Sequence, residues 1–332
     1  MGRLRRTVSN VALSAVSVVI FFSILEIATR LLWHYEVKGP HVGLVLEEAN
    51  RQVVSEEVEY RINGLGLRMN REVAPETRED LRRVLALGDS FVWGDGLVYE
   101  ALVTVKLEEI LSTEVGTVEV INAGVNGYNT TDELEQLIHL APVCCPDLVI
   151  VFFFTNDLLS RRRDSGGGIA TKPDRRLRIK EFLRTRSKFC AYLYYLYKDK
   201  LVASIGVPKF VLPADYFNLD DSKPGWVAFK KAALQIREEC LQSDMALIFV
   251  MIPTLTHLDE SYPYAELRRE TKDFLDESRI RVIDLFDTYA PYNPSDLWIS
   301  PENTHWNGLG TSLAAKEIVD YVKQHGLLPP AL

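Results

Sequence analysis

The sequence predicts an α/β fold in which a five-stranded parallel sheet is covered by helices on both faces, with one membrane-spanning helix ahead of it. Short apolar runs alternate with longer helical patterns over most of the chain. One of these runs, Val149–Phe154, is apolar at every position, as expected of a strand that is buried on both faces. The 332 residues leave room for one large domain and additional segments.

The chain opens with an apolar stretch. Residues 7–25 contain no charged residue, and as a helix they would be about 28 Å long, close to the thickness of the hydrocarbon layer. Three arginines lie among residues 1–6, which places that end in the cytoplasm. We therefore expect an uncleaved signal anchor over residues 7–33, in a single-pass inner (plasma) membrane protein whose domain is periplasmic or extracellular. A cleaved signal peptide is less favoured because no A-x-A site follows the stretch, and a soluble amphipathic helix is the third alternative.

The remainder of the chain divides into a stalk and a domain. Residues 34–80 are polar and mixed and are expected to form an extracytoplasmic stalk, with the domain over residues 81–326. The alternation of short apolar runs and helical patterns in the domain is typical of a parallel sheet with crossover helices. The expected strands are Val84–Leu87, Val118–Ile121, Leu148–Phe154, Ala246–Ile252 and Val282–Leu285. The expected helices include Leu102–Leu111, Thr131–Leu140 and Trp226–Leu241, and the last is Thr311–Val322.

A basic insertion interrupts the alternation at about residues 160–215. Between Arg161 and Lys188 there are 11 Lys/Arg and 3 Asp/Glu, a balance of +8 that leaves −16 for the remainder of a chain whose net charge is −8. Two interpretations stay open, a solvated loop with a packed helix, or a contact with anionic lipid headgroups or a polyanionic substrate. The acidic chain as a whole argues against a nucleic-acid partner.

The four cysteines, Cys144, Cys145, Cys190 and Cys240, form no C-x-x-C pair and no Cys/His cluster with metal-ligand spacing. We therefore predict no metal site and no disulfide framework, and we expect buried thiols. The sequence also lacks a G-x-G-x-x-G motif and a P-loop, so no cofactor is expected.

Four short polar motifs follow expected strands. They are Gly88-Asp89-Ser90 after the first strand, Asn122–Gly127 after the second, Asn156-Asp157 after the third, and Glu302–His305 after the fifth. The carboxyl ends of parallel strands meet at one edge of the sheet, so these motifs should converge there. A serine nucleophile needs a base, usually a histidine that a third group orients, and the oxyanion that forms needs preorganised donors. The motifs together supply each of these parts.

The set of Ser90, Gly127, Asn156 and His305 resembles the name-giving residues of the SGNH (GDSL-type) hydrolase superfamily, and the resemblance covers about residues 81–326. It implies a flavodoxin-like three-layer α/β/α sandwich. It also implies that Ser90 is the nucleophile and His305 its base. The backbone N–H groups of Ser90 and Gly127, with the side-chain amide of Asn156, would then form the oxyanion hole.

Two further segments bear on this resemblance. Asn63–Arg68 looks like a segment found ahead of the serine motif in membrane-anchored members of the superfamily. The third catalytic residue departs from the family pattern, which has Asp three residues before the histidine, whereas this chain has Glu302. We expect Glu302 to orient His305, with Asp296 as the alternative.

We therefore expect a serine esterase that acts through an acyl-enzyme on an extracytoplasmic carbohydrate or lipid ester. The same residues would serve an O-acyltransferase that acetylates an exported polysaccharide, with a membrane protein as its acyl-donor partner. A third alternative, from a different class, is a non-catalytic scaffold on the same fold.

Overall fold

The computed structural model describes residues 17, 21–31, 52–55, 58–73, 80–158, 187, 189, 192, 193, 223–301 and 303–328. The chain forms two compact units. The first comprises residues 1–42 and 163–212, and the second comprises residues 43–162 and 213–332.

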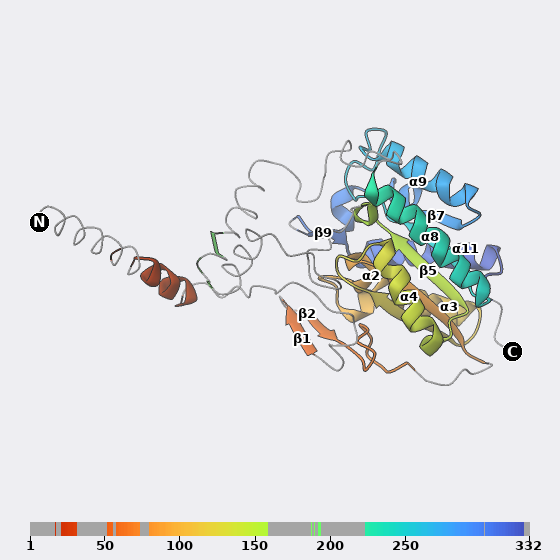
Figure 1. Ribbon diagram of the computed structural model, residues 1–332, viewed down its shortest axis with the longest axis horizontal. Coiled ribbons are helices and arrows are strands. Elements are labelled where there is room, and N and C mark those ends of the chain that lie inside the picture. Colours follow the sequence, from red (N-terminus) through yellow and green to blue (C-terminus); the bar gives the residue numbers. More distant parts are fainter. Residues whose placement is uncertain are drawn as a thin grey trace, which may run out of the picture. The chain divides into compact units, whose positions relative to one another are not determined.

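A five-stranded parallel sheet forms the centre of the second unit (Figure 1). Its strands are β3 (Arg82–Gly88), β4 (Val118–Gly124), β5 (Leu148–Phe153), β6 (Ala246–Met251) and β7 (Arg281–Asp284). Their spatial order is β4-β3-β5-β6-β7, so the first strand of the sheet lies between the second and the third. This is the flavodoxin-like order, and it confirms the predicted fold. All seven residues of β4 and all six of β5 are buried, as expected of strands covered on both faces.

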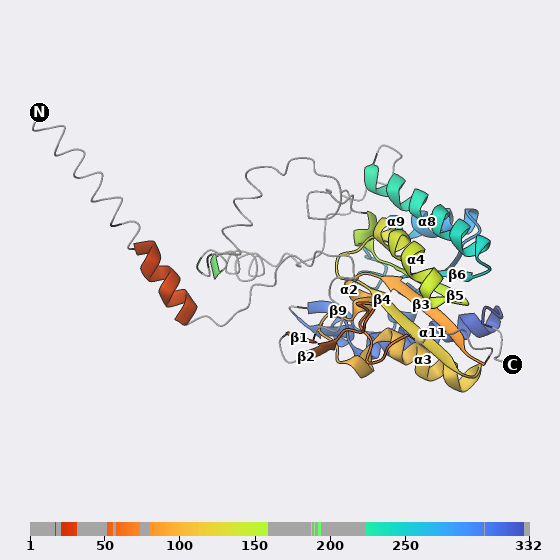
Figure 2. The same ribbon diagram turned by 60° about the horizontal axis from the view of Figure 1, so that its bottom comes forward.

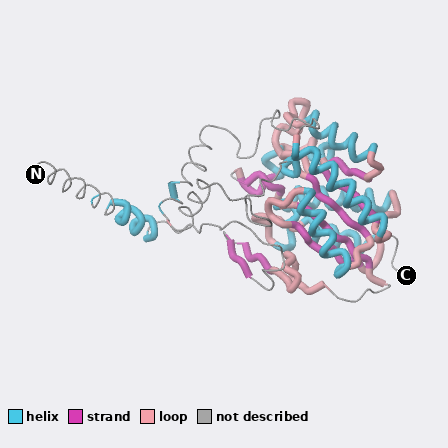
Figure 3. The backbone as a smooth tube through the Cα atoms, in the orientation of Figure 1, coloured by secondary structure: helices cyan, strands magenta, loops and turns pink. Residues whose placement is uncertain are grey.

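Helices cover both faces of this sheet. Figure 2 shows α3 (Val103–Glu114) and α11 (Gly308–Gln324) on one side, and α4 (Thr130–Cys144), α8 (Pro224–Gln242) and α9 (Ala265–Glu277) on the other. Figure 3 shows the same layers with the strands in magenta and the helices in cyan. The three-layer arrangement therefore agrees with the sequence-based expectation.

Among the described residues, helix α9 is a long helix that was not named from the sequence. Most of its residues are charged, and its buried side chains are only Leu267, Thr271 and Leu275, spaced four residues apart along one face. These residues recur with helical spacing, but so few apolar residues among so many charged ones do not make the segment stand out as part of a core.

Several short elements connect the layers. They are β1 (Gln52–Ser55), β2 (Val58–Arg61), α2 (Ser90–Trp93), η2 (Tyr99–Ala101), η3 (Thr155–Leu158), α10 (Phe286–Tyr289), η6 (Pro294–Leu297), β8 (Trp298–Ser300) and β9 (Asn303–Trp306). β1 pairs with β2 and β8 pairs with β9, both antiparallel.

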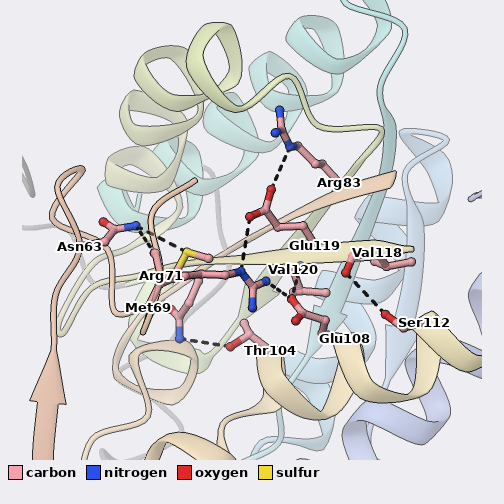
Figure 4. Close-up of polar contacts among 11 residues, drawn as sticks. Asn63, Met69, Arg71, Arg83, Thr104, Glu108, Ser112, Val118, Glu119 and Val120 are labelled. Atoms are coloured by element: carbon pink, nitrogen blue, oxygen red, sulfur yellow. Dashed lines mark hydrogen bonds and ion pairs between the residues drawn. The ribbon is translucent and has the colours of Figure 1, made fainter. Parts of the chain in front are cut away.

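Part of the expected stalk packs into the second unit. Residues 58–73 carry buried apolar side chains, which are Tyr60, Ile62, Leu67, Met69 and Val73. Ion pairs add to this packing, and Figure 4 shows Arg71 between two carboxylates, Glu108 of α3 and Glu119 of β4. The buried Arg83 side chain of β3 meets the same Glu119 at 2.9 Å.

The first unit is described over fewer residues. Residues 21–31 are helical, and the Glu26 carboxylate accepts hydrogen bonds from the Ser187 hydroxyl at 2.7 Å and the Phe189 backbone N–H at 3.0 Å. The membrane-spanning helix expected at residues 7–33 is described only at residues 17 and 21–31, and no helix within the described ranges is both long and apolar enough to cross a bilayer. Most of residues 7–20, and nearly all of the basic insertion, lie outside the described residues.

Three cysteines lie within the described residues, and all three are free thiols. Cys144 and Cys240 are buried, as expected, whereas Cys145 is exposed. Cys190 lies outside the described residues.

Candidate active site

Ser90 lies at the carboxyl edge of the sheet, where β3 ends and α2 begins. The side chain of Asp89 caps α2 by accepting a hydrogen bond from the Phe91 backbone N–H at 2.9 Å. Ser90 is therefore the first helical residue, and the N–H groups of a first turn have no partner within their own helix. The Ser90 backbone N–H is thus suited to donate to an oxyanion.

The side chain of His305 meets that of Ser90. Ser90 Oγ lies 2.8 Å from His305 Nε2, although the two residues are 215 positions apart in the chain. The neighbouring Trp306 is fully buried and donates its indole N–H to the Phe91 carbonyl at 3.0 Å. The Phe91 ring also packs on the His305 ring, with centroids 4.8 Å apart. These contacts hold β9 against α2 and bring the predicted nucleophile and base together.

The other ring nitrogen of His305 has a partner that the sequence analysis missed. Nδ1 of His305 lies 2.6 Å from Oδ1 of Asn303, which also accepts the His305 backbone N–H at 3.2 Å. Because an amide oxygen can only accept, Nδ1 carries the proton and Nε2 is left to accept from Ser90. This is the tautomer that a general base requires.

The sequence could have indicated Asn303 as a partner of His305, because residues two apart on a strand have side chains on the same face. Of the two residues expected to orient His305, Glu302 lies outside the described residues. Asp296 is exposed, and its carboxylate accepts from the Asn293 side chain at 3.3 Å.

The two remaining motif residues lie next to this pair. Asn156, in η3, donates its side-chain N–H to Asp89 Oδ2 at 2.6 Å, which leaves its second N–H available to a substrate. The turn that contains Gly127 is tied to the Ser90 loop, because the Val125 N–H donates to the Gly88 carbonyl at 3.0 Å. At Gly127, where φ is +76°, no heavy atom lies within 4 Å of the position that a Cβ would take. Both residues are thus attached to the segment that carries Ser90.

A close backbone contact fixes the end of β4 against α2. A Cβ on Gly124 would lie 2.2 Å from the backbone nitrogen of Trp93, so only glycine fits there. Asn122 reinforces the contact by donating its side-chain amide to the Val92 carbonyl at 2.9 Å. The Asn122–Gly127 motif thus packs directly on the helix that carries the nucleophile.

Burial sets the protonation of His305. Burial lowers the pKa of His305 below its ordinary value, and the carboxylates of Asp89 and Asp95 oppose that shift only in part. The imidazole is therefore neutral at pH 7 and able to take a proton from Ser90.

Three fully buried carboxyl groups lie behind the site. Burial raises the pKa of Asp89, Glu133 and Asp157. Repulsion from neighbouring carboxylates raises the pKa of Glu133 and of Asp157 further. Hydrogen bonds from Phe91 and Asn156 oppose the shift for Asp89. Of the three carboxyl groups, Asp89 thus has the most hydrogen bonds that stabilise its charged form.

Comparisons with known proteins identify the family of this chain. The model of the GDSL-like Lipase/Acylhydrolase family matches residues 86–313. No curated protein is similar enough to this chain to count as a match.

Solved structures show a distant likeness. An acetyl xylan esterase, AlAXEase, is 17% identical with a TM-score of 0.43, covering 72% of this chain and 99% of its own. A lipase/acylhydrolase from Enterococcus faecalis is 18% identical with a TM-score of 0.44, covering 74% and 96%. The psychrotrophic esterase EstA from Pseudoalteromonas sp. is 14% identical with a TM-score of 0.43, covering 74% and 98%. No substrate follows from likeness at these identities and TM-scores.

Proposed function

The chain belongs to the GDSL-like lipase/acylhydrolase family, and on that premise we propose that it is a serine-dependent ester hydrolase that works through an acyl-enzyme. The observation that carries the proposal is the chain of contacts from Ser90 Oγ to His305 Nε2, 2.8 Å, and from His305 Nδ1 to Asn303 Oδ1, 2.6 Å. It joins a nucleophile, a base and a group that fixes the base's tautomer.

The reaction proceeds in two steps. Ser90 Oγ attacks the ester carbonyl carbon while His305 Nε2 takes the hydroxyl proton. The oxyanion that forms accepts hydrogen bonds from the backbone N–H groups of Ser90 and Gly127 and from the Asn156 amide. The C–O bond to the alcohol then breaks, and His305 returns the proton to the departing alcohol. Water attacks the acyl-serine in the second step, His305 takes its proton, and the carboxylic acid leaves while Ser90 regains its hydrogen.

The experiment compares wild type with Ser90→Ala, using a fluorophosphonate probe and short-chain p-nitrophenyl esters. Without the hydroxyl there is no group to acylate, so labelling is lost and kcat falls by on the order of a thousandfold or more. Ser261→Ala, at an exposed serine, is the matched control and keeps both activities. Labelling of Ser90→Ala at the wild-type rate would refute the proposal.

The acyl acceptor is tested with the same protein. We propose water as the acceptor and a carbohydrate or lipid ester outside the cytoplasm as the substrate. Incubation with an acetylated oligosaccharide should release free acetate. Transfer of the acyl group to an added sugar hydroxyl, with little free acid, would instead identify an acyltransferase.

Two residues are candidates for orienting His305, and paired variants separate them. Asn303→Ala removes the amide oxygen that accepts the Nδ1 proton. Glu302→Gln removes the carboxylate that the family resemblance indicates. Each variant should lower kcat more than it changes KM if its residue acts through His305, because that interaction supports the transition state. The residue whose variant leaves kcat unchanged has no such role.

We also propose, from the sequence, that residues 7–33 anchor the protein and leave the second unit outside the cytoplasm. In the helix over residues 21–31, Phe21, Ile24, Ile27 and Leu31 are exposed apolar side chains, which supports a lipid contact. A cysteine introduced at position 45 should react with a membrane-impermeant maleimide in intact cells, or in spheroplasts where an outer membrane is present. Reaction only after lysis of the inner membrane would put the second unit in the cytoplasm.

A further inference from the structure

A segment outside the four catalytic motifs holds the loop that follows the nucleophile. We call residues 58–68 the brace. Its last residue, Arg68, is 1% exposed, and its guanidinium donates hydrogen bonds to three carbonyls, of Trp93 at 2.6 Å, Gly94 at 2.5 Å and Leu97 at 2.5 Å. All three belong to the end of α2 and the loop after it, which we call the post-helix loop, residues 93–97.

These carbonyls need an outside donor. The last carbonyls of a helix have no partner within that helix, and here the chain turns away at Gly94, whose φ is +78°. A Cβ on Gly94 would lie 2.1 Å from Leu102 and 2.8 Å from the Arg68 guanidinium, so the backbone approaches the arginine directly. The planar guanidinium of Arg68 therefore donates to all three carbonyls of this turn, which a shorter side chain with fewer N–H groups could not do.

A tyrosine of the brace completes this contact. The Arg68 guanidinium lies 4.2 Å from the centre of the Tyr60 ring, and the Tyr60 hydroxyl accepts the Gly96 N–H at 2.8 Å. The Tyr60 ring also stacks on Trp93, with centroids 6.1 Å apart. Burial lowers the pKa of Arg68 to about 10, so the guanidinium is still charged at neutral pH. A buried charge is costly, and here it is offset by hydrogen bonds to one loop.

The post-helix loop in turn touches the residue that holds His305. A Cβ on Gly96 would lie 3.1 Å from Asn303 Nδ2 and 3.1 Å from the Ile299 side chain, so the loop packs closely on β8 and β9. Asn303 Oδ1 then lies 2.6 Å from His305 Nδ1. A continuous path of contacts thus runs from Arg68 through the loop to the base.

The brace is itself fixed to the sheet. The side chain of Asn63 accepts the backbone N–H groups of Leu65 and Leu67 at 3.0 and 2.9 Å and donates to the Arg71 carbonyl at 3.2 Å. The Arg71 side chain is paired with Glu108 and Glu119, as Figure 4 shows. The brace can therefore hold the loop in one position relative to β4.

We propose that Arg68 and Tyr60 are positioning residues for His305, which act through residues 93–97 and Asn303. This inference rests on the proposed hydrolase function. It assigns a catalytic purpose to a segment that precedes the serine motif and that contributes no group to the reacting atoms.

The test measures kcat per active site, counted by titration with the fluorophosphonate probe. Arg68→Lys keeps the charge but cannot reach three carbonyls, so kcat should fall about tenfold to a hundredfold while KM changes less than about threefold. Tyr60→Phe removes only the hydroxyl that accepts the Gly96 N–H, and kcat should fall about threefold to tenfold. Arg237→Gln is the matched control, since it removes the hydrogen bond that Arg237 of α8 donates to the Ser278 carbonyl at 2.7 Å and does not touch the post-helix loop. It should lower the melting temperature and leave kcat per active site at the wild-type value.

The outcomes separate the possible explanations. If Arg68→Lys and Tyr60→Phe lose thermal stability but keep wild-type kcat per active site, as is expected of Arg237→Gln, the residues are merely structural and the inference is overturned. If Arg68→Lys does not fold, Tyr60→Phe decides alone. A wild-type protein that neither reacts with the probe nor turns over esters would refute the proposed function instead, independently of either variant.

Discussion

At the scale of single residues, Asp89 serves the site through two different oxygens. Oδ1 caps α2 and so sets the conformation of Ser90, whereas Oδ2 accepts the Asn156 amide at 2.6 Å. Since an amide has two N–H groups on one nitrogen, holding the first toward Asp89 directs the second. Asp89 therefore orients the side-chain amide of Asn156, the proposed oxyanion donor.

The variant Asp89→Asn separates these two roles. Asparagine is as good a helix cap as aspartate, so its oxygen keeps the Phe91 contact. Its NH₂ group would face the NH₂ group of Asn156, which must rotate away from its present orientation. We expect kcat to fall on the order of a hundredfold with little change in KM, the usual cost of one oxyanion donor.

A double-mutant cycle and a surface control complete that experiment. In an Asn156→Ala background, Asp89→Asn should add little, because both changes remove the same donor. Asp259→Asn, at an exposed aspartate that accepts the Ser261 N–H at 2.8 Å, should leave kcat unchanged. Additive losses in the cycle would mean that Asp89 acts independently of Asn156.

At the scale of elements, α4 carries a buried acid across from the site. The helix begins with a capping box in which Asn129 and Asp132 bond to each other's backbone N–H groups. One residue later, Glu133 is fully buried, and neither of its carboxylate oxygens has a hydrogen-bond partner among the described residues. Burial, then repulsion from Asp157 and Asp89, raises its pKa well above the ordinary value. The structure therefore favours the protonated, neutral form.

This pKa shift makes stability depend on pH. Between the ordinary glutamate pKa, about 4.3, and the raised value in the fold, the folded protein binds a proton that the unfolded chain has released. Stability contributed by Glu133 is therefore lost as the pH rises through that window. Glu133→Gln removes the titration, so its melting temperature should exceed that of the wild type by more at pH 8 than at pH 5. The difference in unfolding free energy should grow by up to about 1.4 kcal/mol per pH unit.

Glu135→Gln is the control for that comparison, since Glu135 is exposed on the same helix. It should leave the pH dependence of the melting temperature unchanged. A constant difference between Glu133→Gln and wild type from pH 5 to pH 8 would show that Glu133 titrates normally in the fold.

At the scale of the whole second unit, stability and chemistry lie at opposite ends of the sheet. Arg83, the second residue of β3, is buried with Glu119 of β4 at 2.9 Å and also donates to the Cys144 carbonyl at 3.0 Å. Ser90 follows the other end of the same strand, about 17 Å further along by the rise of a strand. The buried ion pair therefore ties β3, β4 and α4 together away from the reacting groups.

We expect Arg83→Met to destabilise the protein by about 3 kcal/mol, because it leaves a buried carboxylate with a weaker partner, Arg71 at 3.5 Å. The value of kcat per active site should stay at the wild-type level. Denaturant unfolding and active-site titration measure the two quantities. Arg82→Met is the neighbouring control, since Arg82 lies 3.9 Å from Asp147, and it should cost less than about 1 kcal/mol. A loss of kcat in Arg83→Met would show that the two ends of the sheet are coupled.

The strands and the motif residues could be predicted because their signals are local. A strand buried on both faces must be apolar throughout, as β5 is, and the polar residues that follow such strands meet at one edge. This was enough to predict Ser90 and His305 as partners across 215 positions of the chain. Helix α9 was not named from the sequence because most of its residues are charged, so it does not stand out as an apolar segment.

The sequence by itself therefore determined the order of the elements in the second unit, because burial leaves a periodic pattern along the chain. Its motifs, through their family resemblance, indicated Ser90 and His305 as the proposed nucleophile and base. Only the tertiary structure decided what surrounds them. That Asp89 orients Asn156, and that Arg68 binds the loop after Ser90, are contacts between groups of separate segments. Hydrogen bonds of this kind depend on distance in space and leave no periodic pattern in the sequence, so packing alone selects which of many polar residues make them.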